Sequence, residues 1–191
     1  MWGICGIGVA RGGPPSSEGI LRKMNASISH RGPDEDGFYV NEKVGLASRR
    51  LSIIDLTSGT QPISNEDGSI RIVFNGEIYN YRELRDYLEK HGHLFRTQSD
   101  TEAILHLYEE FGTDCLQHLD GIFAFAIWNE NKQELLLARD RMGIKPMYYT
   151  HLPDWQFIFG SEMKSILTNP AVKREIDLIS LNEYLSYELF I

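Results

Sequence analysis

The stretch that does most to decide the fold is GIFAFAIWNENKQELLLARD, residues 121–140. Its first part, 121–128, is a continuous apolar run that predicts a buried strand, and 129–132 has the residues of a tight turn. Residues 134–140 predict a second strand that pairs with the first. Because strands joined by so short a turn run antiparallel, the stretch predicts a β-hairpin within an antiparallel sheet.

Similar patterns lie on both sides of this hairpin. Strands are predicted at 3–10, 38–40, 44–48, 69–74, 147–149 and 156–160, and helices at 18–29, 81–91 and 101–111, with short ones near Met163 and Leu181. Residues 30–34 are predicted as a loop, and the strand at 69–74 as ending at Asn75-Gly76. Hairpin-joined strands with few helices favour the α+β class with antiparallel sheets over a doubly wound parallel sheet.

Composition predicts one globular domain over residues 1–191. Of its residues, 42% are hydrophobic and 24% are charged, which is ordinary for a soluble protein. The formal net charge of -8 argues against a nucleic-acid partner, because phosphate binding needs a basic surface. The chain ends in apolar sequence at 189–191, so we expect a longer protein in which about 180–191 begins a linker.

The two cysteines, Cys5 and Cys115, make no disulfide framework. Neither they nor the six histidines show the paired spacing of a metal site, so no metal is expected. No signal peptide is apparent, and no uncharged apolar run approaches the roughly 20 residues of a membrane span. These features predict a reducing, cytoplasmic setting without a membrane partner.

Polar residues between Arg50 and Asp100 form a candidate site. Each alone has a simpler interpretation, because an isolated arginine is usually solvated, an Asn-Gly pair such as 75–76 is usually a turn, and Ser99-Asp100 is usually a helix cap. Together they offer what glutamine requires. Arg50 can bind a carboxylate bidentately, Asp100 can balance an ammonium, and an asparagine amide with a glycine N–H can hold an oxyanion.

A series of motifs follows along the whole chain: HRGPD (30–34), RLSIIDL (50–56), QP (61–62), NGEIYN (75–80), SDTE (99–102), GIFAFA (121–126), ARDRMGIKP (138–146) and SEMK (161–164). In this order they resemble the N-terminal glutaminase domain of glutamine-hydrolysing asparagine synthetases. The resemblance implies a class II amidotransferase and N-terminal-nucleophile hydrolase. It also implies a four-layer αββα sandwich of two antiparallel sheets.

The resemblance also implies roles for individual residues. Arg50 would bind the α-carboxylate of glutamine, and Asp100 with the Glu77 region would hold its α-ammonium. Ile53 and Ile54 would offer backbone to the pocket wall. No cofactor is implied for this domain, which has no phosphate-binding P-loop. ATP and magnesium would act in a synthetase domain of the same longer chain, and the question of a homodimer stays open.

In the catalytic centre, the Asn75 side chain and the Gly76 N–H would form the oxyanion hole. The family nucleophile is a cysteine in the second position, whose thiolate attacks the glutamine amide while its own α-amine is the general base. Two alignments are open here. Either Trp2 stands in the cysteine's place and 3–7 continues the family pattern, or Cys5 is the nucleophile after removal of four residues. The first alignment matches the pattern better.

Trp2 in that position predicts an impaired glutaminase. Its indole is no nucleophile, and its bulk prevents removal of Met1, which would keep the amine displaced. The change is either engineered in a competent domain or natural in a relative that lost the activity. Two further hypotheses remain, a degenerate glutamine-binding or scaffold domain and an amidotransferase for an acceptor other than aspartate.

Overall fold

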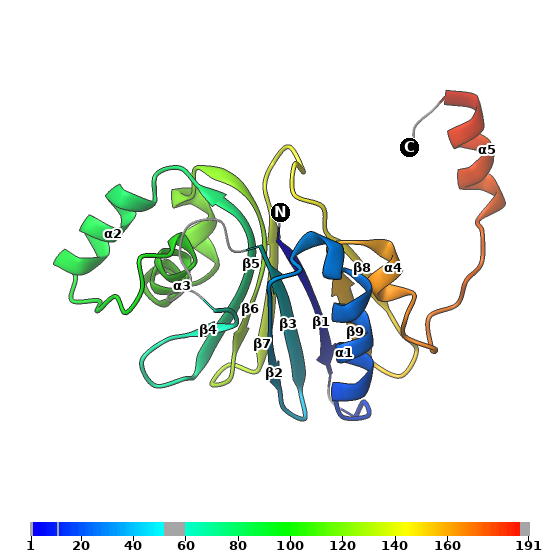
Figure 1. Cartoon of the computed structure of the whole chain (residues 1–191), viewed down its shortest axis with the longest axis horizontal. Helices are drawn as coiled ribbons and strands as arrows, with labels where there is room; N and C mark the ends of the chain where they lie inside the picture. Colours follow the sequence, from blue (N-terminus) through cyan, green and yellow to red (C-terminus); the bar gives the residue numbers. More distant parts are fainter. Residues whose placement is uncertain (1, 11, 52–59, 188–191) are drawn as a thin grey trace.

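The structure, a computed structural model, consists of two antiparallel sheets stacked face to face, with helices on the outer side of each (Figure 1). It describes residues 2–10, 12–51 and 60–187. Within these residues the strand order is β2-β3-β1-β9-β8 in the first sheet and β4-β5-β6-β7 in the second.

The first sheet contains β1 (Gly3–Val9), β2 (Glu35–Val40), β3 (Val44–Arg50), β8 (Tyr148–His151) and β9 (Gln156–Gly160). The second contains β4 (Ile63–Ser64), β5 (Ile70–Ile78), β6 (Gly121–Asn129) and β7 (Glu134–Arg139). Every neighbouring pair is antiparallel. The hairpin predicted at 121–140 is β6–β7, and the hairpin about Pro153 and Asp154 is β8–β9.

The helices cover the outer faces of the sheets. On the first sheet lie α1 (Glu18–Ser27) and α4 (Met163–Ile166), and on the second lie α2 (Tyr81–Lys90) and α3 (Asp100–Phe111). Short 3-10 segments follow α1 (η1, Ser29–Arg31) and α3 (η2, Gly112–His118). The α+β class and the four-layer αββα order expected from the resemblance are confirmed.

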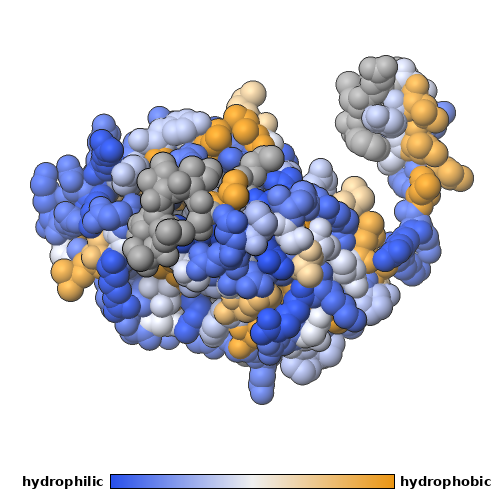
Figure 2. Space-filling model, in the orientation of Figure 1, coloured by the Kyte–Doolittle hydropathy of each residue, from blue (hydrophilic) through white to orange (hydrophobic). Residues whose placement is uncertain are grey.

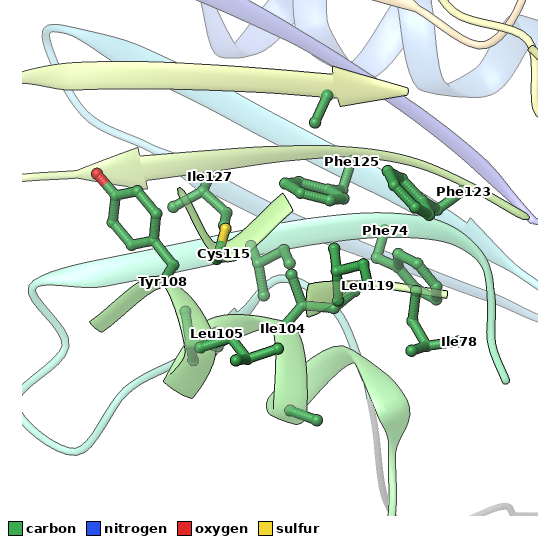
Figure 3. Close-up of a cluster of buried hydrophobic side chains, with 14 of the residues drawn as sticks. Phe74, Ile78, Ile104, Leu105, Tyr108, Cys115, Leu119, Phe123, Phe125 and Ile127 are labelled. Carbon is green, nitrogen blue, oxygen red and sulfur yellow. The ribbon is translucent and has the colours of Figure 1, made fainter. Parts of the chain in front are cut away.

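Three clusters of buried apolar side chains hold the layers together. One lies between the second sheet and α2 and α3, where Phe74, Phe125 and Ile104 are almost fully buried (Figure 3). Each such side chain stabilises the fold by about 1.5–3 kcal/mol relative to an exposed one. A second cluster lies between the first sheet and α1 and α4, and the third lies between the two sheets.

Alternation along each strand decides which cluster a side chain joins. In β1, Ile4 belongs to the cluster between the sheets, whereas Cys5 and Ile7 belong to the cluster beneath α1. In β5, Val73 faces the other sheet and Phe74 faces the helices. Polar side chains on the same side of a strand as Ile4 in β1 or Val73 in β5 therefore enter the space between the two sheets.

Strand β5 differs from its prediction, because it continues through Asn75-Gly76 to Ile78 instead of ending at residue 74. Asn75 pairs with Ala124 and Gly76 with Phe123 of β6, so the Asn-Gly pair is no turn. A Cβ on Gly76 would lie 2.2 Å from the Ile122 carbonyl oxygen. Glycine at position 76 thus allows β6 to approach β5 closely. Because this requirement comes from a distant segment, the local sequence pattern does not reveal it.

Two smaller corrections concern the surrounding segments. The predicted loop at 30–34 begins inside the 3-10 turn η1, and Arg50 is the last residue of β3 instead of following a strand. The apolar run predicted at 51–54 lies outside the described residues beyond Leu51, and so do Ile53 and Ile54.

The chain then leaves the two-sheet body and forms α5 (Leu178–Tyr187), which stands apart from the sheets in Figure 1. One side of α5 is hydrophobic in Figure 2, and Leu178, Ile179 and Leu185 each expose more than 70% of their surface. Among the described residues, no helix is long and apolar enough to cross a membrane.

Candidate active site

Trp2 and Arg50 lie side by side at one end of the first sheet. Gly3 pairs with Arg49, so Trp2 and Arg50 are the next residues along antiparallel β1 and β3. The Arg50 guanidinium carbon lies 5.5 Å from the centroid of the Trp2 ring, a cation–π distance. Arg50 is only 9% exposed, and its Nη1 donates to Glu35 Oε2 at 3.2 Å. The structure thus places the predicted carboxylate-binding arginine next to the predicted nucleophile position.

Asn75 lies on the facing sheet. It stands two residues after Val73 in β5, so its side chain projects into the space between the sheets. The side chain is 2% exposed, and its Nδ2 has no hydrogen-bond partner among the described residues. An unsatisfied buried amide donor costs about 1–3 kcal/mol, and an acceptor on a bound ligand would remove this cost.

Gln61 joins these two sides of the site. Its backbone oxygen accepts a hydrogen bond from Ser48 Oγ of β3 at 2.9 Å. Its side-chain Oε1 accepts from the Phe74 N–H of β5 at 2.6 Å, and its Nε2 donates to Thr101 Oγ1 of α3 at 3.3 Å. This buried residue therefore holds the end of β3, the neighbour of Asn75 and the start of α3 together.

Two carboxylates, Asp100 and Glu77, lie at the end of β5. Asp100 is the first residue of α3, which Ser99 caps by accepting from the Thr101 N–H, and Asp100 Oδ2 accepts from the Ile78 N–H at 3.0 Å. Burial and, after it, the nearby Glu77 carboxylate together raise the pKa of Asp100 to about 6, against the opposing hydrogen bond from the Ile78 N–H. A bound ammonium group would be attracted to both carboxylates.

Comparison with known proteins identifies the family of this chain. The profile of the glutamine amidotransferase domain family matches residues 1–190. The chain belongs to this family.

Relatives of the amidotransferase domain agree with the resemblance to asparagine synthetases. Asparagine synthetase (glutamine-hydrolyzing) 2 of Bacillus subtilis is 48% identical over 180 residues, covering 93% of this chain and 24% of the relative. A probable asparagine synthetase of Dictyostelium discoideum is 46% identical over 151 residues, covering 76% of the chain and 27% of the relative. The chain therefore spans about a quarter of the length of these relatives.

Among solved structures, the amidotransferase domain is similar to glutamine phosphoribosylpyrophosphate amidotransferase from B. subtilis in complex with ADP and GMP. The TM-score is 0.73, and the match covers 92% of this chain and 45% of that one. At 24% sequence identity, this likeness supports the fold alone.

Cys5 occupies a different environment from Trp2 in the amidotransferase domain. It is fully buried on the helix-facing side of β1, and burial raises the pKa of its thiol to about 12. Cys115 is also buried, beneath α3, and burial raises its thiol pKa to about 11. A reactive cysteine needs a low pKa and access to its substrate, so both have the properties of packing thiols.

Sequence analysis did not find every residue that supports the site. Glu35, which binds Arg50, lies one residue beyond the HRGPD motif, and Gln61 was noted only as part of the QP motif. Their partners are 13 to 40 positions away along the chain, a separation at which no local period connects them. Ile53 and Ile54 lie outside the described residues, so their predicted part in the pocket wall stays a prediction.

Proposed function

We propose that this chain is the glutamine-binding domain of an asparagine synthetase, and that Trp2 impairs glutamine hydrolysis in it. In the competent form of such a domain, a thiolate attacks the side-chain amide carbon of glutamine. The resulting oxyanion collapses with release of ammonia, and water then hydrolyses the thioester to glutamate. The ammonia serves an amide-forming domain that uses ATP and magnesium.

The observation that carries the proposal is the set of polar groups at the ends of β3 and β5. Arg50 offers a guanidinium to the α-carboxylate, and Asp100 with Glu77 offers negative charge to the α-ammonium. The buried Asn75 amide offers a donor to the oxyanion, together with the Gly76 N–H. These groups match the three polar parts of glutamine.

Impairment follows from the chemistry of residue 2. An indole has no lone pair suited to attack on an amide carbon, and no described cysteine replaces it, because Cys5 faces the helices. The indole also lies beside the Arg50 guanidinium, where the glutamine carboxylate would bind. Trp2 therefore removes the nucleophile and competes for the space of the substrate.

Two substitutions at one position separate these effects. Trp2→Ala removes the indole without adding a thiol, so we expect tighter glutamine binding in calorimetry but no glutamate release. Trp2→Cys supplies the thiol and a small side chain that permits removal of Met1, which mass spectrometry verifies. Restored glutaminase activity in Trp2→Cys, with none in Trp2→Ala, supports a competent pocket.

The opposite outcomes are equally informative. Steady glutamate release by the unsubstituted chain with Met1 intact would disprove the impairment. Inactive Trp2→Cys protein with Met1 removed that still binds glutamine would favour a degenerate glutamine-binding domain. Absence of glutamine binding in both variants would favour a scaffold and overturn the proposed substrate.

The partner in the proposal is a synthetase domain in the same longer chain. Two exposed apolar features suit such a contact, the outer side of α5 and the loop that carries Met142 and Ile144. Asp140 accepts hydrogen bonds from the Ile144 and Lys145 N–H groups and so fixes this loop. A companion domain would also decide the acceptor, so ammonia transfer to aspartate is tested by product analysis with the longer protein.

A further inference from the structure

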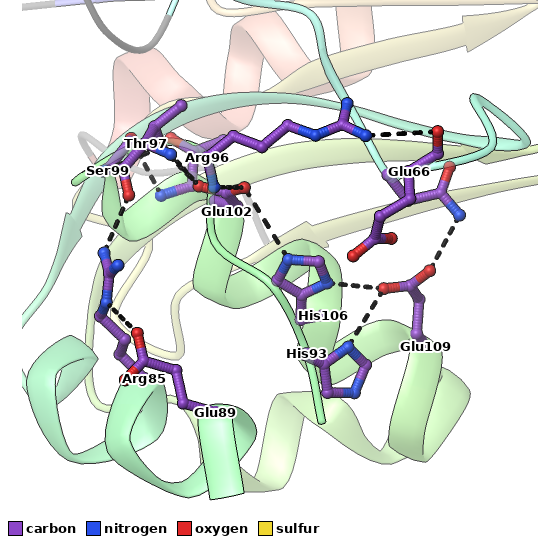
Figure 4. A network of polar contacts seen from close by, with 12 residues as sticks. Glu66, Arg85, Glu89, His93, Arg96, Thr97, Ser99, Glu102, His106 and Glu109 are labelled. Atoms are coloured by element: carbon purple, nitrogen blue, oxygen red, sulfur yellow. Dashed lines mark hydrogen bonds and ion pairs between the residues drawn. The ribbon is translucent and has the colours of Figure 1, made fainter. Parts of the chain in front are cut away.

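A cluster of nitrogen and oxygen ligand atoms lies in the helical layer over the second sheet. His93 belongs to the segment between α2 and α3, and His106 and Glu109 stand three residues apart on α3. One ligand atom from each of the three residues lies within 4.8 Å of the others. Figure 4 shows both rings turned toward the Glu109 carboxylate.

Glu109 Oε2 is the centre of this cluster. It lies 2.7 Å from His106 Nδ1 and 3.6 Å from His93 Nδ1. The His106 side chain is almost fully buried, whereas His93 and Glu109 keep 14% and 20% of their side-chain surface exposed. An ion could therefore enter from the surface and reach a site with a buried wall.

The far atom of each of these three side chains also faces a polar partner. His93 Nε2 lies 2.8 Å from Glu110 Oε1, and Glu109 Oε1 accepts from Asn65 Nδ2 at 2.8 Å. His106 Nε2 makes no hydrogen bond within the described residues, and the Glu102 carboxylate lies 3.8 Å away from it. Such outer partners orient the ligands of metal sites, typically as a histidine N–H directed at a carboxylate.

The charges around the cluster favour a cation. Besides Glu109, the Glu102 carboxylate lies 3.8 Å from His106 Nε2, and the Glu110 carboxylate lies 2.8 Å from His93 Nε2. A divalent cation bound between the two imidazoles and Glu109 would be attracted by these negative charges.

We propose that His93, His106 and Glu109 form a binding site for one divalent transition-metal ion of the Zn²⁺ type. Two imidazoles and one carboxylate are the donor set that suits zinc, cobalt or nickel, whereas magnesium and calcium prefer oxygen ligands alone. Water completes the coordination on the exposed side. The ion would tie the segment before α3 to the middle of that helix, so its role is structural.

This site was not predicted from the sequence, because the two histidines lie 13 positions apart in the chain. Only the return of the chain after α2 brings His93 against α3. Its ring lies 4.7 Å from that of His106 between centroids. Among the described residues, no hydrogen bond or ion pair joins either histidine to Trp2 or Asn75 of the glutamine pocket.

The test is a titration of the chelator-treated protein with ZnCl₂ in a calorimeter, and with CoCl₂ in a spectrophotometer. We expect one ion per chain and visible absorption bands typical of low-coordinate Co²⁺. His93→Ala and Glu109→Gln should each weaken Zn²⁺ binding at least tenfold. The matched control is His91→Ala, because His91 is exposed and its Nδ1 faces the Tyr87 carbonyl instead of the cluster.

Each outcome decides the proposal. Circular dichroism verifies that the variants are folded, and Glu109→Gln nearly preserves the shape of the side chain if His93→Ala does not fold. Binding lost in both cluster variants and kept in His91→Ala supports the site. The proposal is overturned if the unsubstituted chain binds no Zn²⁺, or if the cluster variants bind Zn²⁺ as tightly as the unsubstituted chain does. The cluster is then only a network of imidazole–carboxylate contacts.

Discussion

Asp100 offers the sharpest test of the charge arrangement in the pocket. Its folded-state pKa is raised from the ordinary 3.8 to about 6, chiefly by burial and then by the Glu77 carboxylate. The ionised form is therefore disfavoured in the folded protein. Between pH 3.8 and about 6 the folded state binds more protons than the unfolded state, so this group makes the protein less stable as the pH rises.

The size of the effect follows from the same values. One unit of pKa corresponds to about 1.4 kcal/mol, so a rise from 3.8 to about 6 corresponds to about 3 kcal/mol. Asp100 is only partly buried, and solvent screens part of this cost, so about 2 kcal/mol is expected at pH 7.5. Asp100→Asn removes the charge while its Oδ1 can still accept the hydrogen bond from the Ile78 N–H.

The assay is urea unfolding of the parent, Asp100→Asn and a control, Asp86→Asn on the exposed side of α2. We expect Asp100→Asn to be about 2 kcal/mol more stable than the parent at pH 7.5, with the difference nearly gone at pH 4. Calorimetry should show weaker glutamine binding for Asp100→Asn only. A stability difference that is absent at pH 7.5, or unchanged at pH 4, would refute the assigned cost of ionisation.

Three further predictions concern packing and reactivity. Gly76→Ala should destabilise the fold by about 2 kcal/mol or more in urea unfolding, because its Cβ would lie 2.2 Å from a β6 carbonyl oxygen. In its control, Gly19→Ala in α1, the new Cβ would meet no atom closer than Ser17 Oγ at 3.9 Å, so this variant should be more stable by about 0.5–1 kcal/mol; equal effects would contradict this view. Gln61→Leu should cost about 2 kcal/mol or more, since a buried β5 N–H loses its acceptor, and an unchanged urea midpoint would speak against the bridge. Cys5 and Cys115 should resist alkylation at pH 8 until urea unfolds the chain, because both thiols are buried and their pKa values are raised to about 12 and 11; rapid labelling of native protein would show otherwise.

Local sequence patterns were sufficient for most of the secondary structure. The apolar run and turn of 121–140 predicted the β6–β7 hairpin, and the spacing at 18–29 predicted α1. Ser99 and Asp100 were predicted at the start of α3, where Ser99 is its N-cap. These features depend on neighbours within about four residues, which is the range of turns, caps and helical periods.

Contacts between distant segments could not be predicted from such local patterns. Asn75-Gly76 has the sequence of a turn, yet it continues β5 because β6 pairs with it across a long interval of chain. The bridge through Gln61, the ion pair of Arg50 with Glu35 and the approach of His93 to His106 likewise join residues that are 13 or more positions apart. Their formation depends on how the layers pack.

Residues 2 and 5 illustrate what the sequence alone determines and what only the tertiary structure decides. Side chains alternate along a strand, so the sequence alone determined that Trp2 and Cys5 belong to opposite sides of β1. The sequence did not determine which side faces α1 and which faces the second sheet. Only the packing of α1 and of the second sheet against the two faces decided this. Cys5 is buried beneath α1, and Trp2 lies beside Arg50, because the two sheets bury their apolar faces against each other and the helix covers the outer face.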